Sequence, residues 1–347
     1  MLYLDIQMFA NHVNVSTDVR TDGQSYPTYN DLSAEMKTYY DLKLLDEAGP
    51  NLVHDQFGQK RPIPAGNGKT IEFRKFTALP DALTPLTEGV TPDGQRLDVN
   101  AYTATVSQYG DYITQSDVLE LTAIDNTIVE ATKLLGEQAG ITLDKVVRDA
   151  LVGGTNMLLC PKWNGTTATV PQTRAGLDAT AKLTVDMLEE AAARLKAQNA
   201  RTFDGYFVAI AHPYVIHDIR RDPEWIDAHK YASPEELYTG EVGRIAGIRF
   251  VESTNAKIWK GGTSEPSGLA VFATLIFGRD AYGVTEVTGG GLQTIVKQKG
   301  SAGTADPLDQ RSSVGWKATR VAEILNNAYM IRLESCSPKF SSIASAN

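Results

Sequence analysis

The longest run of helix-like spacing lies between Asp117 and Leu151, where apolar residues recur every three or four positions. These apolar positions are Leu121, Ile124, Ile128, Ala131, Leu135, Ala139, Leu143, Val146 and Ala150. The period predicts one continuous amphipathic helix. The sequence DVLE can form a capping box at its start, and Gly153-Gly154 ends it. At about 1.5 Å per residue the helix would be on the order of 50 Å long, which suits a spine.

Residues 69–106, which precede this helix, alternate with a period of two and predict a long β-hairpin. The alternation changes phase on both strands: Ile71 and Phe73 share a face that Phe76 does not, and the return strand shifts after Ala101. Because side chains alternate strictly along a strand, such a shift requires a bulge or a twist, so we expect bent strands. The tip contains three prolines, which cannot donate to a β-ladder. The pattern predicts an arm that does not fold onto itself.

The rest of the chain mixes helical and strand-like segments. A helix is predicted over 30–49, after a polar and turn-rich start, and a second one over 185–198 with Thr184 as its N-cap. Apolar runs bounded by turns predict a buried strand at 206–212 and further strands at 245–253 and 269–278. Pro213 is expected to begin a short helix after the first of these strands. The order of elements predicts a mixed α+β fold.

Composition and charge exclude several classes of protein. Apolar residues make up 42% of the 347 residues and charged residues 22%, which is typical of a globular protein. The net charge of −9 disfavours a protein that grips nucleic-acid phosphates, but not a container that surrounds DNA. Cys160 and Cys336 show no metal spacing and make no disulfide framework, which fits a reducing cytoplasm. No apolar run approaches the roughly 18 residues that span a bilayer, and the short apolar start makes a poor signal peptide.

Few residues have the spacing of a catalytic site. The strongest candidates are His212, His217 and Asp218, at a predicted strand–helix junction. An enzyme would use His217 for proton transfer, with Asp218 or His212 orienting it. The two histidines are five residues apart and so do not share a helix face for a metal. The simpler interpretation places His212 in the junction and His217 on a helix surface, and we expect no catalytic, cofactor-binding or metal-binding residues.

The stretch GNGKT, residues 66–70, contains the Gly-Lys-Thr of a phosphate-binding loop. Such a loop requires another glycine five places before, where this chain has Ile63. The lysine also opens a predicted strand instead of a helix. The stretch therefore predicts a turn.

Five stretches carry a resemblance to a known family. LGEQAGITLDKVVRDALVGGTN (135–156) resembles the end of a spine helix, and DGYFVAIAHPYVIHDIRRDPEWIDAHKYA (204–232) with GEVGRIAGIRFVES (240–253) resembles an axial domain. FGRDAYGVTEV (277–287) and IVKQKGSAGTADPLDQRSSVGWKATRVAEILN (295–326) resemble the returning part of a peripheral domain. The family is the major capsid proteins of tailed bacteriophages, with the Hong Kong 97-type fold. More narrowly, the chain resembles the branch typified by the capsid protein of coliphage N-four.

The resemblance implies an order of domains along the chain. These are an N-terminal arm (1–58), an extension-loop β-hairpin (59–115), a peripheral domain with the spine helix (116–180), an axial domain (181–268) and returning strands of the peripheral domain (269–347). The hairpin would lie across a neighbouring subunit, where its faces become buried. This would explain an arm that does not fold onto itself.

The resemblance also implies a structural protein and not an enzyme. It would self-assemble into hexamers and pentamers of an icosahedral shell around double-stranded DNA, which it would not bind sequence-specifically. Its partners would be copies of itself together with scaffolding, portal and cement proteins, and no membrane. It would be located in the virion, after assembly in the host bacterial cytoplasm.

Three alternatives remain open. Encapsulin-like nanocompartment shells share this fold and enclose enzymes instead of DNA, and a scaffold or tail component would lack the axial and peripheral stretches. A small-oligomer hydrolase using His217 and Asp218 is a more remote alternative. Size in solution separates the classes, because a shell protein sediments as capsomers or shells and an enzyme as a small oligomer.

Overall fold

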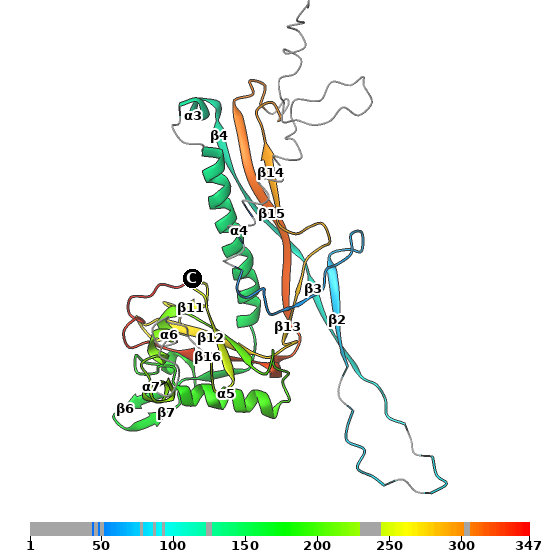
Figure 1. The fold of residues 1–347 in the computed structure, drawn as a ribbon, viewed down its shortest axis with the longest axis vertical. Helices are drawn as coiled ribbons and strands as arrows, with labels where there is room; N and C mark the ends of the chain where they lie inside the picture. The colour runs from blue at the N-terminus through cyan, green and yellow to red at the C-terminus, as the bar shows by residue number, and fades with distance from the viewer. Residues whose placement is uncertain are drawn as a thin grey trace, which may run out of the picture. The chain divides into compact units, whose positions relative to one another are not determined.

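The computed structural model describes residues 44, 48, 52–76, 79–85, 88–91, 94–122, 127–229, 244–301 and 306–347 (Figure 1). The chain divides into two compact units. Unit 1 comprises Met1–Leu52, Ser107–Asp144 and Val287–Arg320, and unit 2 comprises Val53–Val106, Lys145–Glu286 and Val321–Asn347. Most of the predicted N-terminal arm lies outside the described residues. Of the helix predicted over 30–49, only Leu44 and Ala48 are described, and both are helical and buried.

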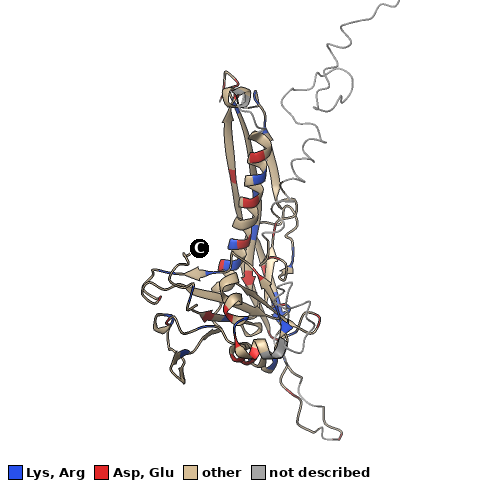
Figure 2. Ribbon diagram, turned by 60° about the vertical axis from the view of Figure 1, so that its left-hand side comes forward, with Lys and Arg blue, Asp and Glu red and all other residues tan. Residues whose placement is uncertain are grey.

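Unit 1 combines helices with an antiparallel sheet. The helices are α3 (Asp117–Thr122) and the first part of α4 (Thr127–Val152), and the strands are β4 (Ser107–Ser116), β14 (Gln293–Lys297) and β15 (Arg311–Ile324). β15 is the central strand, with β4 paired along ten residues and β14 along five. Leu135, Ala139 and Leu143 of α4 pack against Val314, Trp316 and Ala318 of β15. Charged residues of both signs recur along α4 (Figure 2), and Lys133 and Glu130 form an ion pair at 2.7 Å.

The predicted end of the spine helix is confirmed, since α4 ends at Val152, directly before Gly153. Residues 123–126 lie outside the described residues, so a continuous helix from Asp117 stays a prediction. The predicted apolar face is confirmed in the middle of the helix but wrong at Leu121, which lies in α3 outside the core cluster and is 81% exposed. It is also wrong near the end of the helix, where Val147 and Leu151 are buried and Val146 and Ala150 only partly.

The buried stripe of α4 follows steps of four residues. It runs through Ala131, Leu135, Ala139, Leu143, Val147 and Leu151. Because an α-helix turns once in 3.6 residues, a row with steps of four drifts around the helix axis. Residues 146 and 147 are both valine, so the sequence is compatible with burial of either one. The residues that pack on α4 decide which of the two is buried.

Unit 2 contains a seven-stranded mixed sheet. The strand order is β5 (Met157–Leu159), β16 (Met330–Ser335), β12 (Val271–Phe277), β8 (Phe207–Ala211), β10 (Ile248–Glu252) and β9 (Arg244–Ile245), and β11 (Ile258–Trp259) also pairs with β12. Every residue of β8, β12 and β16 is buried, as in strands with both faces covered. The strands predicted at 206–212, 245–253 and 269–278 are present as β8, β10 and β12, and the predicted burial of the first is confirmed. β10 is only partly buried, with Arg249 and Glu252 exposed.

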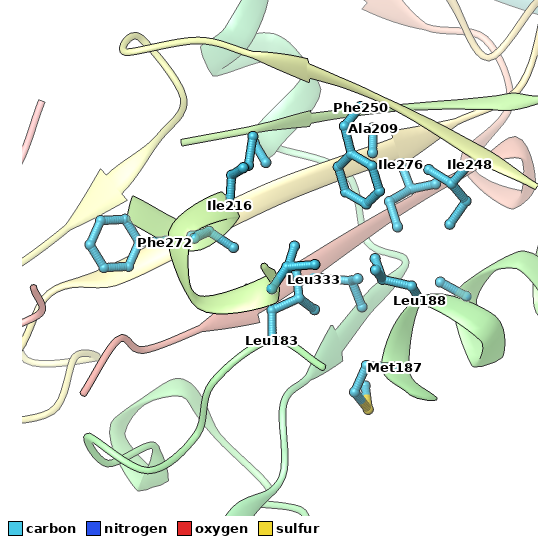
Figure 3. Packing of buried hydrophobic residues seen from close by; sticks show 14 of the residues in the cluster. Leu183, Met187, Leu188, Ala209, Ile216, Ile248, Phe250, Phe272, Ile276 and Leu333 are labelled. Atoms are coloured by element: carbon cyan, nitrogen blue, oxygen red, sulfur yellow. The ribbon is translucent and has the colours of Figure 1, made fainter. Parts of the chain in front are cut away.

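Helices cover one face of this sheet (Figures 1 and 3). Leu188 of α5 (Val185–Ala197) and Ile216 of α6 (Pro213–Ile219) pack in one cluster with Ile276 and Leu333 of the sheet, as Figure 3 shows. α7 (Pro223–His229) follows and adds the buried Trp225. The predicted helix starts after Thr184 and at Pro213 are both confirmed.

The other face of the sheet has a second cover. Val208 and Ile210 of β8 pack there against Val147 and Leu151 of α4 and against β13 (Tyr282–Thr285). β13 pairs in parallel with β1 (Gln59–Lys60) and antiparallel with Val321–Ile324 of β15. The sheet is therefore the middle layer of three.

Short elements complete unit 2. They are the hairpin of β6 (Lys162–Asn164) and β7 (Thr167–Thr169) and the 3₁₀ turns η2 (Arg174–Gly176) and η4 (Asn327–Tyr329). The sheet takes β8 and β10 from the range 181–268 and β12 and β16 from the range 269–347. The domain boundaries expected from the resemblance stay predictions.

The long hairpin is present as β2 (Thr70–Phe76) and β3 (Val99–Thr105). Seven pairs run without interruption from Thr70–Thr105 to Phe76–Val99, so the bulge expected within these strands is absent. The apolar residues change phase for a different reason: one face of the hairpin is buried in this chain, and the other face also carries apolar residues but is exposed. The turn predicted for GNGKT is confirmed, with Gly66 and Gly68 at positive φ before β2 begins.

Candidate interaction surface

The inner face of the β2–β3 hairpin packs against the rest of unit 2. Phe73 and Ala104 are each 3% exposed and pack with Leu325, just after the end of β15. The ring of Phe73 lies directly over Gly283 of β13, where an added Cβ would come within 2.8 Å of it. Because only a glycine permits this approach, Gly283 allows the hairpin base to sit against β13.

The outer face of the hairpin has no cover among the described residues. Phe76 and Val99, which are directly paired, are 59% and 45% exposed, and Leu97 is 57% exposed. Side chains paired across strands in this way form a continuous apolar surface. Contiguous exposed apolar surface marks interaction sites on soluble proteins. The outer face is therefore a candidate contact surface.

The hairpin tip is more exposed still. Its described residues, 79–85, 88–91 and 94–98, belong to no helix or strand, which confirms the predicted absence of a ladder for this part. Leu79, Leu83 and Val90 are 55%, 85% and 61% exposed. The Gln95 side chain donates to the Pro80 carbonyl at 3.4 Å across the tip. The tip thus presents apolar side chains without a backbone ladder beneath them.

Unit 1 has an exposed strand edge of its own. β4 pairs with β15, and within the described part of the chain no strand pairs with its other edge. Eight of its ten residues are exposed, among them Tyr112 at 70%. A long unpaired edge is a template for adding another strand. β4 is a second candidate contact surface.

The structure separates the residues of the predicted histidine site. His212 caps α6: its Nδ1 accepts a hydrogen bond from the Tyr214 backbone N–H at 3.2 Å. Its ring lies 4.7 Å from that of Tyr214 and 5.5 Å from that of Phe272, and it is only 8% exposed. Burial lowers the pKa of His212 below its usual value. His212 is therefore placed as a neutral capping residue in the junction.

His217 and Asp218 do contact each other. His217 Nδ1 lies 3.3 Å from Asp218 Oδ1, and the edge of the His217 ring faces Phe340. No described pocket is lined by either residue. Among the described residues, no group of three or more His, Cys, Asp or Glu side chains is placed to hold a metal ion. The pair joins a partly exposed histidine to a buried carboxylate and has no described pocket beside it in which a substrate could react.

The two cysteines are buried free thiols. Burial raises the pKa of Cys160 far above its usual range and that of Cys336 to about 11. A thiol with a raised pKa carries little nucleophilic thiolate. Both cysteines therefore act as small apolar residues.

A buried charge cluster was missed from the sequence. Glu334, 0% exposed, accepts two hydrogen bonds from Arg174 at 2.7 Å each and one from Arg332 at 2.8 Å. The Arg332 guanidinium also donates to the carbonyls of Val152 and Gly154, at the end of α4. A cation at this position satisfies the last carbonyls of the helix and opposes its dipole. The signal was the pair of alternate charges in the apolar run MIRLES.

The Arg174 guanidinium also stacks on the Trp259 ring, 3.7 Å from its centroid. The hydrogen bonds to Glu334 raise the pKa of Arg174. The cluster ties η2, β11 and β16 to the end of α4 within unit 2. Its groups pair with each other and leave no free acid or base, so its role is structural.

None of the described helices is both long enough and apolar enough to cross a membrane.

Comparisons with known proteins agree with the fold. A family model described as phage capsid protein matches residues 85–303. A structure of the cyanophage P-SCSP1u capsid is 15% identical, with a TM-score of 0.63, covering 82% of this chain and 88% of that chain. The head of Helicobacter pylori bacteriophage KHP40 is 13% identical, with a TM-score of 0.60, covering 94% and 97%. The capsid of cyanophage Pam1 is 14% identical, with a TM-score of 0.59, covering 93% and 99%. No curated protein matches significantly. The fold is thus the Hong Kong 97-type α+β fold of phage capsids.

Proposed function

The chain belongs to the phage capsid protein family, whose members form viral shells, and from this premise we propose that it is the major capsid protein of a tailed bacteriophage. It assembles into hexamers and pentamers that form an icosahedral shell around double-stranded DNA. The observation that carries this proposal is the hairpin, which buries one face in its own subunit and exposes apolar residues on the other face.

The hairpin is the part of the chain best suited to join subunits. In this proposal it is the extension loop, and the exposed Phe76, Leu97 and Val99 become buried against a neighbouring subunit. Burial of apolar area contributes roughly 25 cal/mol per Å². Many copies of one modest contact stabilise a closed shell, because each subunit donates one hairpin and receives another.

The charge supports a container instead of a DNA-binding protein. A net charge of −9 repels the phosphate backbone, so packaged DNA would be enclosed without sequence-specific binding. The shell would assemble in the host bacterial cytoplasm with scaffolding, portal and cement proteins as partners. The narrower relation to the coliphage N-four branch rests on the stretches quoted above.

The domain division belongs to the same proposal. The spine helix α4 with β4, β14 and β15 corresponds to the peripheral domain, and α5, α6, β8 and β10 correspond to the axial domain. β12 and β16 return from the peripheral range; β12 pairs with β8 and β16 pairs with β12, so we assign their sheet to the axial domain. The assignment also moves β4 out of the extension-loop range 59–115 and β5 out of the range 116–180.

Two alternatives make different predictions. An encapsulin-like shell would have the same fold and enclose protein cargo, so its particles would lack DNA. A small-oligomer hydrolase would depend on His217 and Asp218, which line no described pocket. The capsid proposal needs neither cargo enzymes nor catalysis.

Expression of the chain in a bacterial host tests the proposal. Analytical ultracentrifugation and negative-stain electron microscopy should show capsomers or closed shells. In particles isolated with the other phage proteins, nuclease treatment followed by quantification should recover protected double-stranded DNA. A chain that remains a monomer or small oligomer under all conditions, alone and with a scaffolding protein, would contradict the proposal. Shells filled with protein and without DNA would favour the encapsulin-like alternative.

A further inference from the structure

Unit 2 contains a basic pocket at the base of the hairpin. Its volume is about 250 Å³. Its wall includes four basic residues and one carboxylate: Arg61, Arg74, Lys75, Arg201 and Asp280. Aromatic rings of Phe73, Tyr102 and Tyr329 form further parts of the wall. The pocket is cationic and aromatic in a chain whose net charge is −9.

The positive charge of this basic pocket is only partly neutralised. Arg74 pairs with Glu72 at 2.7 Å, and Arg201 lies 3.9 Å from Asp280. Lys75 lies over the Tyr329 ring, 5.8 Å from its centroid. Within the part of the chain that the structure describes, no carboxylate lies within 4.0 Å of the basic groups of Arg61 or Lys75. The basic pocket therefore attracts a negatively charged group.

The size of the basic pocket favours side chains over a free small molecule. Sites for small molecules usually have volumes of roughly 300 to 1,000 Å³. At about 250 Å³, this pocket suits one or two side chains of a protein segment. The aromatic wall and the cations together suit a segment that carries both apolar and acidic side chains.

The hairpin tip has this composition. Between Lys75 and Arg96 the sequence contains three acidic residues and no lysine or arginine. Two of the acids, Asp81 and Glu88, are described and exposed, and Leu83 is 85% exposed beside them. Arg96, near the end of the tip, pairs with Asp98 at 3.7 Å. The tip and the basic pocket are thus complementary in charge and in apolar character.

We propose that the acidic hairpin tip of one copy of this chain docks into the basic pocket at the hairpin base of a second copy. This inference rests on the proposed self-assembly and assigns it a specific contact. Tip residues do not line the basic pocket of their own chain, and in Figure 1 the described tip continues beyond the ends of β2 and β3. Each subunit then offers one tip and one pocket, which is the arrangement of a closed ring.

Charge reversal on each side tests the contact. The tip variant is Asp81→Lys with Glu88→Lys, and the pocket variant is Arg61→Glu with Lys75→Glu. Each variant alone should reduce the yield of capsomers and shells at least about tenfold at low salt, because like charges face each other across an interface. A chain with all four changes should recover assembly. The wild-type assembly rate should fall as salt rises.

A mixture of the two variants distinguishes contact between chains from contact within one chain. When the two variants alternate in a ring, each reversed tip meets a reversed pocket and each unchanged tip meets an unchanged pocket, so mixed hexamers should form although neither variant assembles alone. A contact within one chain would let the four-change protein assemble but not the mixture. Recovery in the four-change protein without recovery in the mixture would therefore overturn the proposal.

Controls separate the outcomes. Arg221→Glu with Arg249→Glu matches the charge change at exposed positions outside the pocket wall and should assemble normally. Circular dichroism checks that each variant folds, and Arg61→Gln with Lys75→Gln replaces the pocket variant if that one does not. A pocket or tip variant that forms shells in normal yield would overturn the docking contact alone. A wild-type chain that never assembles would overturn the proposed function as well.

Discussion

The seven-stranded sheet and the β2–β3 hairpin belong to the same unit but bury their residues very differently. Every residue of β8, β12 and β16 is buried, because helices cover one face and α4 with β13 covers the other. The hairpin has one covered face, and its other face exposes Phe76 and Val99. The sheet buries both of its faces within one subunit, whereas the outer face of the hairpin can be buried only by contact with another molecule.

This difference separates residues that stabilise the subunit from residues available for assembly. Removing a buried residue of the sheet leaves a cavity or an unpaired charge in one chain. Removing an exposed residue of the hairpin changes little in one chain, because water already covers it. Stability and assembly should therefore respond to different mutations.

A charge in the middle of the sheet should have the largest effect. Ile276→Asp places a carboxylate at a position that is 0% exposed, between β8 and β16. The expected cost is several kcal/mol, which exceeds half the stability of many domains. We expect insoluble protein or a melting temperature lowered by more than about 10 °C. The matched change Phe76→Asp on the outer face of the hairpin should leave melting nearly unchanged, and equal losses in both variants would contradict the comparison.

Deletion of the hairpin tip should abolish assembly and spare the fold. Removing residues 79–94 takes away exposed apolar and acidic residues that belong to no strand. The circular dichroism spectrum and the melting temperature should match those of the wild type. Sedimentation should show monomers where the wild type shows capsomers or shells. Normal shells from the deletion protein would remove the hairpin from the assembly contact.

Along the part of the spine helix in unit 1, the stability cost of replacing an apolar residue by alanine should rise with the burial of that residue. Leu135 is 2% exposed in the core cluster, whereas Ile128 only packs against its rim. Leu135→Ala should cost about 2 to 5 kcal/mol and Ile128→Ala clearly less. The midpoint of urea unfolding gives both values. A larger cost at Ile128 than at Leu135 would contradict this order.

A smaller effect should come from the pH dependence of His212. Burial lowers its pKa in the folded chain below the usual value of about 6.5, so the unfolded chain binds a proton at a higher pH. Stability is therefore present above about pH 6.5 and decreases as the pH falls below it, toward the lower pKa of the folded chain. His212→Asn keeps an N-cap acceptor but does not titrate. Its melting temperature should change less than the wild type's between about pH 7.5 and 5.5. An identical change in both proteins would assign the pH dependence to other groups.

The smallest effect should follow from His217→Ala. His217 is partly exposed and contacts Asp218 and Phe340. A single side chain of this kind contributes under about 1 kcal/mol. The assembly yield should stay within a factor of a few. A hydrolase activity that disappears in this variant would instead support the enzyme alternative.

The periodicity of apolar residues and the positions of glycine and proline predicted most of the local structure. Apolar runs bounded by turns predicted β8, β10 and β12, Pro213 marked the start of α6, and Gly153 marked the end of α4. These signals work because they depend on neighbours within a few residues. The resemblance to capsid proteins added the fold, which no local period could supply.

Contacts between distant residues decided the rest. The burial of Val147 instead of Val146 depends on what packs against α4, since both residues are equally apolar. The cluster of Arg174, Arg332 and Glu334 joins segments more than 150 positions apart, so the charges within MIRLES could not by themselves identify Arg174 as the partner of Glu334. His212 and His217, close in sequence, have separate partners, because one ring turns into the junction and the other toward Phe340.

The hairpin shows both sides of this division. The sequence by itself determined that the strands form and that their apolar residues occupy two faces, because alternation depends only on strand geometry. The tertiary structure decided which face is buried: Gly283 leaves room for Phe73, so the face with Phe73 and Ala104 is covered and the face with Phe76 is not. The physical reason is that a strand has two equivalent faces until a neighbour packs on one of them.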